Sequence, residues 1–411
     1  MHFCFILKKC RPLGKIILKF TGENNQEFLV PTLLRIENEL WDAEKQRPKN
    51  IYLKSGKKLN VKLDRLRIAL TAYLKQLESK KAVCTPEAIG RRIKTCCRKA
   101  TAYPKGSLLH YMQLYIESRL HLISNATYKR YVVFLRLIER FEGFRMQTLS
   151  LETVNAGFVK DFLLFGEKEQ YSQSTVYRTV NFVRTILNFL EKRGTRTFAY
   201  ELELPKQRTA KKSFVTLNEA ELAAIRKAKL PEELEPARDW LVISSYTGQR
   251  VSDFLRFDNC MLETIDAKKY LSFVQQKTGK QILLPMHPVV LEVLKNNNGC
   301  FPAKIPIQKY NKQIKEVARL AGINHRVTVR KRRGFRAFLQ TIPKWEAVSS
   351  HIGRRSFATN FYGRIPTPLL MEATGHGTEE MFLRYIGTAD TGRATELGMY
   401  FEQTHGNSRA A

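Results

Sequence analysis

The chain has 411 residues, and its 70 lysines and arginines against 38 aspartates and glutamates give a formal net charge of +32. The length exceeds that of one ordinary hydrophobic core, and a hydrophobic fraction of 43% excludes a chain that is disordered throughout. The distributed basic residues favour a long polyanionic partner such as nucleic acid, and no apolar run is long enough for a membrane span or a signal peptide, so we expect a cytoplasmic protein.

The first hundred residues are predicted to form a small basic α+β module. β-Branched and aromatic residues in Lys15–Phe20 and Glu27–Val30 indicate two strands. The helical spacing of apolar residues predicts a helix over Leu59–Leu77, and Thr85 is typical of an N-cap that starts a second helix. We therefore place the end of the first domain near residue 100.

Residues 105–205 are predicted to be wholly helical. The candidate helices are Leu108–Arg119, Thr127–Phe141, Phe158–Leu164 and Ser174–Leu190. The apolar residues expected to be buried in the last of these are Val176, Val180, Val183, Ile186 and Leu190. Short loops between the helices favour a compact bundle. Basic residues occupy the faces left exposed, where a solvated helix face explains each of them better than nucleic-acid binding does.

A polar, basic linker at Pro205–Ser213 precedes the last domain, residues 214–400. Thr216–Glu219 has the pattern of a capping box ahead of an apolar run. We expect a mainly helical domain with one small strand region, in which Lys269–Gln275 and Gln281–Met286 flank a turn. The polar residues 401–411 are interpreted as a tail.

The first segment that indicates chemistry is Tyr246–Asp253. The preceding apolar helix is predicted to end at Gly248 and a new helix to begin near Ser252, so that Arg250 falls in the break. A guanidinium group at a helix break matches the geometry of a phosphate, and Asp253 is placed to orient it. An arginine that only forms a surface ion pair with Asp253 explains this segment equally well.

The second segment is the turn that carries Lys277. A lysine on a turn can reach into a site and give a proton to a leaving oxygen. Lys280 lies in the same turn and competes for this role. On local grounds a solvated turn lysine is the simpler interpretation.

The third segment is His351–Thr359. His351 and Arg354 are three residues apart and therefore share one face of a helix. An imidazole beside a guanidinium suits a phosphate or an oxyanion, while Phe357 and Ala358 are expected to pack into the core. The alternative is a partly buried histidine that is hydrogen-bonded to the backbone.

The fourth segment is Thr374–Tyr385. A helix that begins near Pro368 is predicted to end at Gly375, which places His376 in a loop. Thr378 is expected to cap a short helix that ends at Tyr385. The alternative for Tyr385 is an ordinary core tyrosine.

Together the four segments contain two arginines, a lysine, two histidines and a tyrosine, which is what phosphoryl transfer without a metal requires. Two guanidinium groups can bind the charged non-bridging oxygens of the transition state. A phenol is neutral at pH 7, since its ordinary pKa is about 10, so it needs a group that accepts its proton. The sequence has no carboxylate cluster typical of a two-metal nuclease, and its seven cysteines form no Cys-x-x-Cys pair. We expect reduced thiols and no metal cofactor.

These segments resemble the tyrosine recombinase, or phage integrase, family. The matches are Thr247–Asp253 to the T-G-x-R-x-S-[DE] pattern, Lys277 to the hairpin lysine, His351 and Arg354 to H-x-x-R, and Gly375, His376 and Tyr385 to G-H-x(8)-Y. The resemblance covers residues 214–400 through these motifs, and residues 105–205 as the core-binding half of a DNA clamp. The first hundred residues, with Leu40-Trp41-Asp42, are similar to the arm-binding module of integrases from Bacteroides-type mobile elements.

The resemblance implies a mainly α fold, in which a small α+β arm-binding module precedes a helical core-binding domain and a mostly helical catalytic domain with a small β-hairpin or sheet. It implies that Tyr385 attacks the scissile phosphate to form a 3′-phosphotyrosyl bond and frees a 5′ hydroxyl. Arg250 and Arg354 would bind the non-bridging oxygens. Because the covalent bond conserves the phosphodiester energy, no nucleotide cofactor is needed.

The remaining roles also follow from the resemblance. Lys277 would protonate the leaving 5′ oxygen, His351 would take the proton from Tyr385, and His376 would hydrogen-bond the phosphate. Gly353 stands where many members of the family have leucine, which is expected to loosen its helix slightly. The basic insert Arg326–Arg336 is not explained by catalysis, and we interpret it as a DNA-contacting loop, with a solvated surface as the alternative.

The function implied is that of a site-specific recombinase, most simply the integrase of a mobile element. Its expected partners are double-stranded DNA at core sites and at arm-type sites, further copies of the chain that assemble on DNA as a tetramer, and a DNA-bending accessory protein; no membrane partner is expected. A resolvase or DNA-inversion enzyme would use the same chemistry, as would a type IB topoisomerase. A DNA-binding regulator with idle catalytic residues belongs to a different class.

Overall fold

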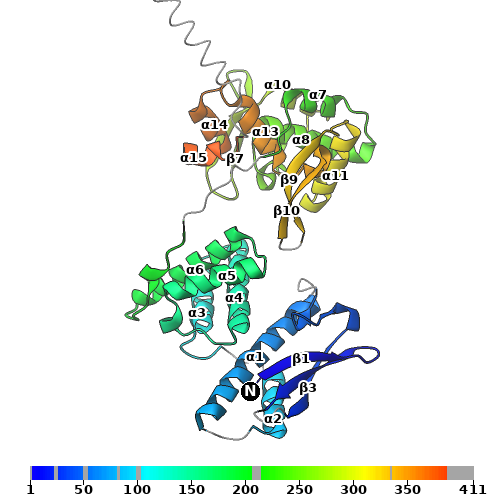
Figure 1. Ribbon diagram of the computed structural model, residues 1–411. Coiled ribbons are helices and arrows are strands. Elements are labelled where there is room, and N and C mark those ends of the chain that lie inside the picture. The colour runs from blue at the N-terminus through cyan, green and yellow to red at the C-terminus, as the bar shows by residue number, and fades with distance from the viewer. Residues whose placement is uncertain are drawn as a thin grey trace, which may run out of the picture. The chain divides into compact units, whose positions relative to one another are not determined.

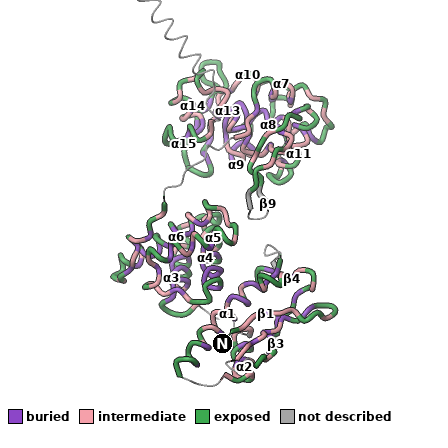
Figure 2. The backbone as a smooth tube through the Cα atoms, in the orientation of Figure 1, coloured by how far each residue is buried: buried purple, intermediate pink, exposed green. Residues whose placement is uncertain are grey.

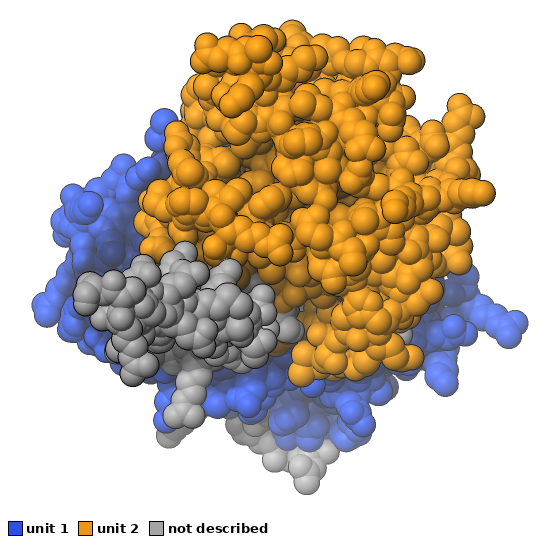
Figure 3. Space-filling view, turned by 90° about the horizontal axis from the view of Figure 1, so that it is seen from above, with its two compact units in different colours: residues 1–206, 332–337 blue, residues 207–331, 338–411 orange. Residues whose placement is uncertain are grey.

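The computed structural model describes residues 2–22, 26–49, 54–80, 84–98, 103–205, 214–333 and 336–386. The chain falls into two compact units, coloured separately in Figure 3: unit 1 comprises residues 1–206 and 332–337, and unit 2 comprises residues 207–331 and 338–411. Each unit has hydrophobic cores of its own. The predicted linker after Pro205 and the predicted tail, residues 401–411, lie outside the described residues.

The N-terminal part of unit 1 is a three-stranded antiparallel sheet with two helices packed against it (Figure 1). Its elements are β1 (His2–Lys8), β2 (Gly14–Thr21), β3 (Glu27–Ile36), the short pair β4 (Trp41–Asp42) and β5 (Arg47–Pro48), α1 (Lys54–Lys80) and α2 (Pro86–Arg98). Alternate residues of β2 and β3 are buried, as expected of strands covered on one face. The two predicted strands and the first predicted helix are confirmed, and Thr85 Oγ1 accepts the amide hydrogen of Ala88 as an N-cap does.

The helical part of unit 1 is a bundle of four helices with an aromatic-rich core. These are α3 (Leu108–Ser118), α4 (Asn125–Arg145), α5 (Ala156–Lys168) and α6 (Gln173–Glu191). All four predicted helices are confirmed within a few residues at their ends. The apolar positions predicted for the last helix are buried, since their side chains are at most 6% exposed. Side-chain oxygens at Ser107, Ser124, Asn155 and Ser172 cap the four N-termini.

Buried ion pairs join these two parts of unit 1. Both Asp64 carboxylate oxygens on α1 accept hydrogen bonds of 3.2 Å from Arg140 on α4. The other Arg140 nitrogen donates to Glu169 at 3.1 Å, and Arg47 lies 3.7 Å from Asp64. Asp64, Arg140 and Arg47 are between 2% and 8% exposed. Helix α1 therefore packs on α4 through buried charges as well as through apolar contacts.

Unit 2 is mainly helical with a small sheet. Its elements are α7 (Glu219–Lys227), α8 (Glu235–Thr247), α9 (Val251–Phe254), β6 (Leu262–Ile265), β7 (Lys268–Val274), β8 (Gln281–Pro285), α10 (Pro288–Asn296), α11 (Ile307–Leu320), β9 (Arg326–Arg333), β10 (Arg336–Pro343), α12 (Lys344–Ala347), α13 (Ile352–Phe361), α14 (Thr367–Thr374) and α15 (Glu379–Leu383). Helix α8 is buried along almost its whole length, as Figure 2 shows, and α7, α10, α11 and α13 pack around it. The mainly α fold class with small sheets is confirmed.

Three local predictions for unit 2 need correction. The capping box before α7 is formed by Asn218 and Glu221, two residues after the predicted one, because the Asn218 side chain reaches the Glu221 amide. A third strand, β6, joins the predicted pair in a sheet of order β6-β7-β8. The basic insert is a two-stranded hairpin, β9 with β10, and not a loop; the β-branched run at residues 327–329 favours an extended strand.

Gly353 tightens the packing of α13 rather than loosening the helix. A Cβ atom at this position would lie 2.0 Å from Ser244 Oγ and 2.8 Å from the Ser244 carbonyl carbon on α8. The missing side chain therefore lets α13 approach α8 closely, which fixes the helix that carries Arg354. Separately, no helix within the described residues has both the length and the apolar composition that crossing a bilayer requires.

Candidate active site

Arg250 lies at the break between α8 and α9, as the sequence predicted. Helix α8 ends at Gly248 in the left-handed conformation (φ +68°), and Arg250 itself is the N-cap residue of α9. The Arg250 Nη1 atom donates a hydrogen bond of 2.9 Å to the side-chain oxygen of Gln275. The break thus directs the guanidinium toward the turn that follows β7.

Arg354 is fully buried on α13. Its Nη1 atom donates to the Gly248 carbonyl at 2.9 Å, and Nη2 donates to the Thr374 carbonyl at 2.8 Å. Burial and then the charge of Arg250 lower the pKa of Arg354 to about 10, while the neighbouring Tyr385 acts in the opposite direction. Arg354 therefore remains charged at pH 7, and its position is fixed by backbone carbonyls.

His376 orients Arg354 in this arrangement. The Arg354 Nη2 and His376 Nε2 atoms are 2.9 Å apart. Because a guanidinium has no acceptor, His376 Nε2 must accept this hydrogen bond, and Nδ1 must carry the ring hydrogen. That hydrogen points to Thr374 Oγ1, 2.8 Å away. Burial and then the charges of Arg354 and Arg250 lower the pKa of His376 to about 3, so this ring is neutral.

His351 is also neutral at physiological pH. It precedes the first residue of α13, one turn from Arg354. Burial lowers its pKa to about 4, and the positive charges of Arg355, Arg354, Arg250 and Lys277 act in the same direction. A neutral imidazole can accept a proton, which an imidazolium cannot.

The ring of Tyr385 contacts the same group of side chains. Its centroid lies 5.2 Å from the His351 ring, 4.8 Å from the His376 ring and 5.3 Å from Arg354 Cζ. Tyr385 follows α15, which Thr378 caps by accepting the Met381 amide hydrogen, as predicted. Its backbone amide donates to the Phe382 carbonyl at 2.9 Å, and Phe382 is fully buried. The tyrosine is half-buried and belongs to the site rather than to the core alone.

Lys277 occupies the exposed turn between β7 and β8. Two backbone hydrogen bonds of 2.9 Å, from Gln275 N to Lys280 O and from Gly279 N to Gln275 O, close this turn. The turn begins at Gln275, whose side chain accepts a hydrogen bond from Arg250, so the lysine lies on the turn beside that arginine. The structure thus brings all six predicted site residues into one region of unit 2.

Asp253 does not have the predicted contact with Arg250. Its Oδ1 atom accepts the amide hydrogen of Gln276 at 2.9 Å and lies 3.6 Å from Arg256 Nη2. The reason is geometric: α9 is a single turn, and its buried Asp253 faces the start of the hairpin turn. Within the described residues neither Arg250 nor Arg354 forms an ion pair with a carboxylate. The two arginines keep their charge available for an external anion.

Three further residues, not predicted from the sequence, complete the site. Gln249 and Gln275 are fully buried polar side chains, and Thr374 is a fully buried threonine. Gln275 Nε2 donates to Gln249 Oε1 and to the Thr374 carbonyl, each at 3.1 Å. Their place within two residues of a motif residue is the only signal in the sequence, because their contacts span 26 and 99 positions.

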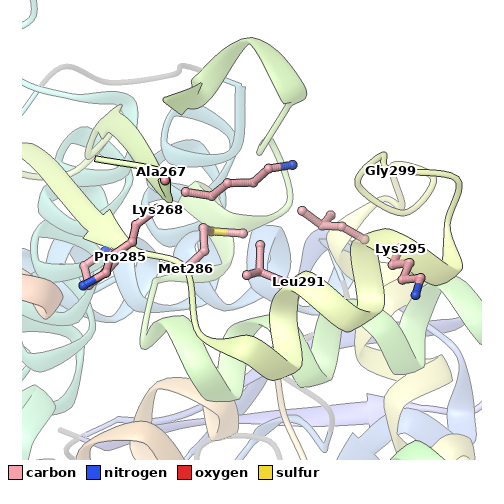
Figure 4. Close-up of a pocket in the computed structure, with 9 residues that line it drawn as sticks. Ala267, Lys268, Pro285, Met286, Leu291, Lys295 and Gly299 are labelled. Atoms are coloured by element: carbon pink, nitrogen blue, oxygen red, sulfur yellow. The ribbon is translucent and has the colours of Figure 1, made fainter. Parts of the chain in front are cut away.

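A separate hollow of about 680 Å³ lies between the β6–β7 turn, the end of β8 and α10 (Figure 4). It is lined by apolar side chains such as Met286 and Leu291 and by Lys268, Lys269 and Lys295 at its rim. None of the six candidate site residues lines it. The described residues also include no group of three histidine, cysteine or carboxylate side chains placed to bind a metal ion.

The comparisons with known proteins agree with this architecture. Residues 107–194 match the phage integrase SAM-like domain, whereas no curated protein matches the chain by sequence. The fold is similar to the Tn1549 transposon integrase in complex with transposon right-end DNA, with a TM-score of 0.52 and 15% identity over 72% of this chain and 99% of that one. It is also similar to a lambda integrase dimer bound to a COC′ core site, with a TM-score of 0.50 and 17% identity over 68% and 95% of the two chains. The fold is therefore similar to that of these two integrases, which the sequence motifs also resemble.

Proposed function

We propose that the chain is a site-specific DNA recombinase that cleaves and rejoins DNA strands through a covalent bond to Tyr385. The observation that carries this proposal is that two neutral imidazoles, His351 and His376, and the buried Arg354 guanidinium each lie within 5.3 Å of the Tyr385 ring. The arginines lack a carboxylate partner among the described residues, so a phosphate is the anion that would complete the site.

In the first step the Tyr385 oxygen attacks the scissile phosphorus. His351 accepts the phenolic proton, because its pKa of about 4 keeps the ring neutral at pH 7. Arg250 and Arg354 bind the two non-bridging oxygens, on which negative charge grows in the transition state. A phosphorus–tyrosine bond forms as the bond to the 5′ oxygen breaks.

The leaving 5′ oxygen takes a proton from Lys277, whose turn is held beside Arg250 by the side chain of Gln275. Lys280 in the same turn is the second candidate for this acid. His376 positions Arg354 through its Nε2 atom, and this contact would have to change before the ring could donate to the phosphate. Religation runs the same steps in reverse and returns the proton to Tyr385.

The expected partners follow from the charge and the domains. We propose residues 1–100 as an arm-site module, 105–205 as the core-DNA-binding domain and 214–400 as the catalytic domain. The β9–β10 hairpin carries exposed Arg326 and Arg330 and is a candidate DNA-contacting ribbon. Strand exchange between two DNA sites requires several active sites, so we propose that the chain assembles as a tetramer on DNA. We also propose a DNA-bending accessory protein, which would bring the arm-type DNA sites close to the core sites. A role as the integrase of a mobile element is consistent with an arm-site module.

The test is covalent trapping on DNA. The substrate is a nicked duplex that spans the joined ends of the DNA element encoding the chain, so that a short fragment diffuses away after cleavage and prevents religation. Wild-type protein is expected to form an adduct that survives denaturation, whereas Tyr385→Phe should bind the duplex with unchanged affinity and form none. Tyr270→Phe on β7, outside the site, is the control and should trap normally.

Two results would overturn the proposal. Trapping by the Tyr385→Phe variant would mean that another residue is the nucleophile. An absence of adducts with wild-type protein on this duplex, and also on fragmented DNA of the host, would leave a DNA-binding regulator as the better interpretation. Relaxation of a plasmid without any specific site would instead indicate a topoisomerase.

A further inference from the structure

The side chain of Gln275 lies at the meeting point of three segments that carry the candidate catalytic residues. It is fully buried although it begins an exposed turn. We propose that Gln275 is a positioning residue that sets the Arg250 guanidinium and the turn of Lys277 relative to one phosphate. This inference rests on the function proposed above and assigns a role to a residue outside the predicted catalytic set.

Every hydrogen-bonding position of the Gln275 amide is used. Its Oε1 atom accepts from Arg250 Nη1 at 2.9 Å and from Thr278 Oγ1 at 2.8 Å. Its Nε2 atom donates to Gln249 Oε1 and to the Thr374 carbonyl, both at 3.1 Å. Two acceptor and two donor positions are all that a glutamine amide has, so the side chain has a single orientation.

A neutral acceptor is the appropriate partner for Arg250. An aspartate or glutamate here would fix the guanidinium equally well, but it would neutralise the charge that binds phosphate. The buried carboxylate of Asp253, by contrast, is directed to the Gln276 amide and to Arg256. The site therefore orients Arg250 with an amide and leaves its positive charge uncompensated.

The same amide oxygen reaches the turn of Lys277. Thr278, the residue after the lysine, donates its hydroxyl hydrogen to Gln275 Oε1. The backbone bonds from Gln275 N to Lys280 O and from Gly279 N to Gln275 O close the turn around Lys277. A displacement of Gln275 would therefore move the lysine and Arg250 together.

The third segment, residues 374–376, comes close to the Gln275 amide because Gly375 has no side chain. A Cβ atom at this position would lie 2.6 Å from Gln275 Oε1 and 2.8 Å from Nε2, and the residue has φ +70°. Both the close approach and the left-handed conformation require glycine here. Gly375 lies between Thr374 and His376, so the Gln275 amide also packs against the loop that orients Arg354.

The experiment compares two neighbouring glutamines. Gln275→Ala and Gln275→Glu are tested beside Gln276→Ala and Gln276→Glu, because Gln276 has an exposed side chain in the same turn. The assay is single-turnover cleavage of two duplexes, one with the ordinary scissile phosphate and one with sulfur as the 5′ bridging atom. A thiolate leaves without an acid, so the sulfur duplex does not need Lys277.

On the ordinary duplex we expect Gln275→Ala to cleave about 10- to 100-fold more slowly than wild type, with DNA affinity unchanged. On the sulfur duplex part of this loss should be restored, because only the Arg250 defect remains. Gln275→Glu should lose more than Gln275→Ala on both duplexes, since its carboxylate would pair with Arg250. Both Gln276 variants should stay within about threefold of wild type on both duplexes.

Thr278→Ala removes only the hydroxyl contact from an exposed residue and keeps the test valid if Gln275 variants fold poorly. Thr278→Ala should cleave the ordinary duplex more slowly than wild type, by a smaller factor than Gln275→Ala does, and should cleave the sulfur duplex at the wild-type rate. The inference is overturned if Gln275 variants cleave at wild-type rates, if the sulfur duplex restores nothing for Gln275→Ala and Thr278→Ala, or if Gln276 variants lose as much activity. If wild-type protein formed no Tyr385 adduct in the same assay, the proposed function would fail instead.

Discussion

In unit 1, Arg140 lies 3.2 Å from Asp64 and 3.1 Å from Glu169, whereas Arg250 and Arg354 in unit 2 have no carboxylate partner among the described residues. Asp64, Arg140 and Arg354 are all buried, so the difference does not come from exposure. In unit 1 each buried cation is matched by an anion of the chain itself. In unit 2 the matching anion has to come from outside, and a DNA phosphate has the required charge and geometry.

The pKa values of nearby groups reflect this difference. In unit 2 the uncompensated arginines, after burial, lower the pKa of His351 to about 4 and that of His376 to about 3. Both imidazoles are therefore neutral in the free protein. In unit 1 burial raises the pKa of Asp64 well above its ordinary value, so its charged form depends on the cations packed against it, such as Arg140 and Arg47. The paired charges of Asp64 and Arg140 belong to the packing of unit 1, whereas the unpaired charges of Arg250 and Arg354 remain able to bind a ligand.

The largest expected effect comes from breaking the paired group. Arg140→Met would leave the buried Asp64 carboxylate without the nitrogen that donates to both its oxygens, with only Arg47 as an ion-pair partner at 3.7 Å, and breaking a buried pair costs about 3–5 kcal/mol of unfolding free energy. Denaturant unfolding of the full chain measures this loss. Arg145→Met is the matched control on the same helix, since the Arg145–Asp161 pair of 2.7 Å is more than a third exposed and contributes about 0–1 kcal/mol. Equal losses in the two variants would mean that burial does not matter here.

Mutation of the unpaired Arg354 should lower the cleavage rate more than the stability of the fold. Arg354→Met removes a cation without leaving a buried ionised partner, so its unfolding free energy should change less than that of Arg140→Met. Its single-turnover cleavage rate should fall about 10²- to 10³-fold, or roughly 3–4 kcal/mol of transition-state stabilisation. Arg384→Met is the control, because Arg384 lies beside Tyr385 but pairs with Glu380 in solvent. A stability loss as large as that of Arg140→Met, with cleavage preserved, would reverse the comparison.

The sequence predicts the local structure of both units well, for identifiable reasons. Helical spacing of apolar residues indicated α1, α3, α4, α5 and α6, and glycine C-caps indicated where α8 and α14 end. These signals lie within one turn of the residues that they describe. Strand β1 was missed because its hydrophobic residues do not alternate with polar ones.

Contacts between distant segments could not be predicted in the same way. The motif spacing identified the residues that gather at the site, but not that Asp253 faces Arg256 or that Gln275 binds Arg250. Asp64 and Arg140 are 76 positions apart, and neither belongs to a motif. Such pairs depend on how helices pack, and a charged residue on a helix gives no local sign that its partner is buried with it.

The smallest expected effect concerns the pH dependence that the unpaired cations create. An imidazole with the ordinary pKa of 6.5 would be mostly protonated at pH 5 and unable to accept the Tyr385 proton. The pKa of His351 in the protein without DNA is about 4. The acid limb of the pH profile of kcat/KM reports the pKa values of the free enzyme, so it should lie near pH 4. Arg355 is the first of the charges that lower this pKa, so Arg355→Met should move the limb to higher pH. The cleavage rate of the variant should then change little at pH 7.5 and fall at pH 5, in assays across that range at fixed ionic strength.

Two results would contradict this prediction: an acid limb of the wild-type protein at pH 6.5, or a limb that does not move in Arg355→Met. Either result would mean that the arginines do not control the protonation of His351. The paired charges of unit 1 and the unpaired charges of unit 2 would then differ in their contacts but not in their effect on the chemistry.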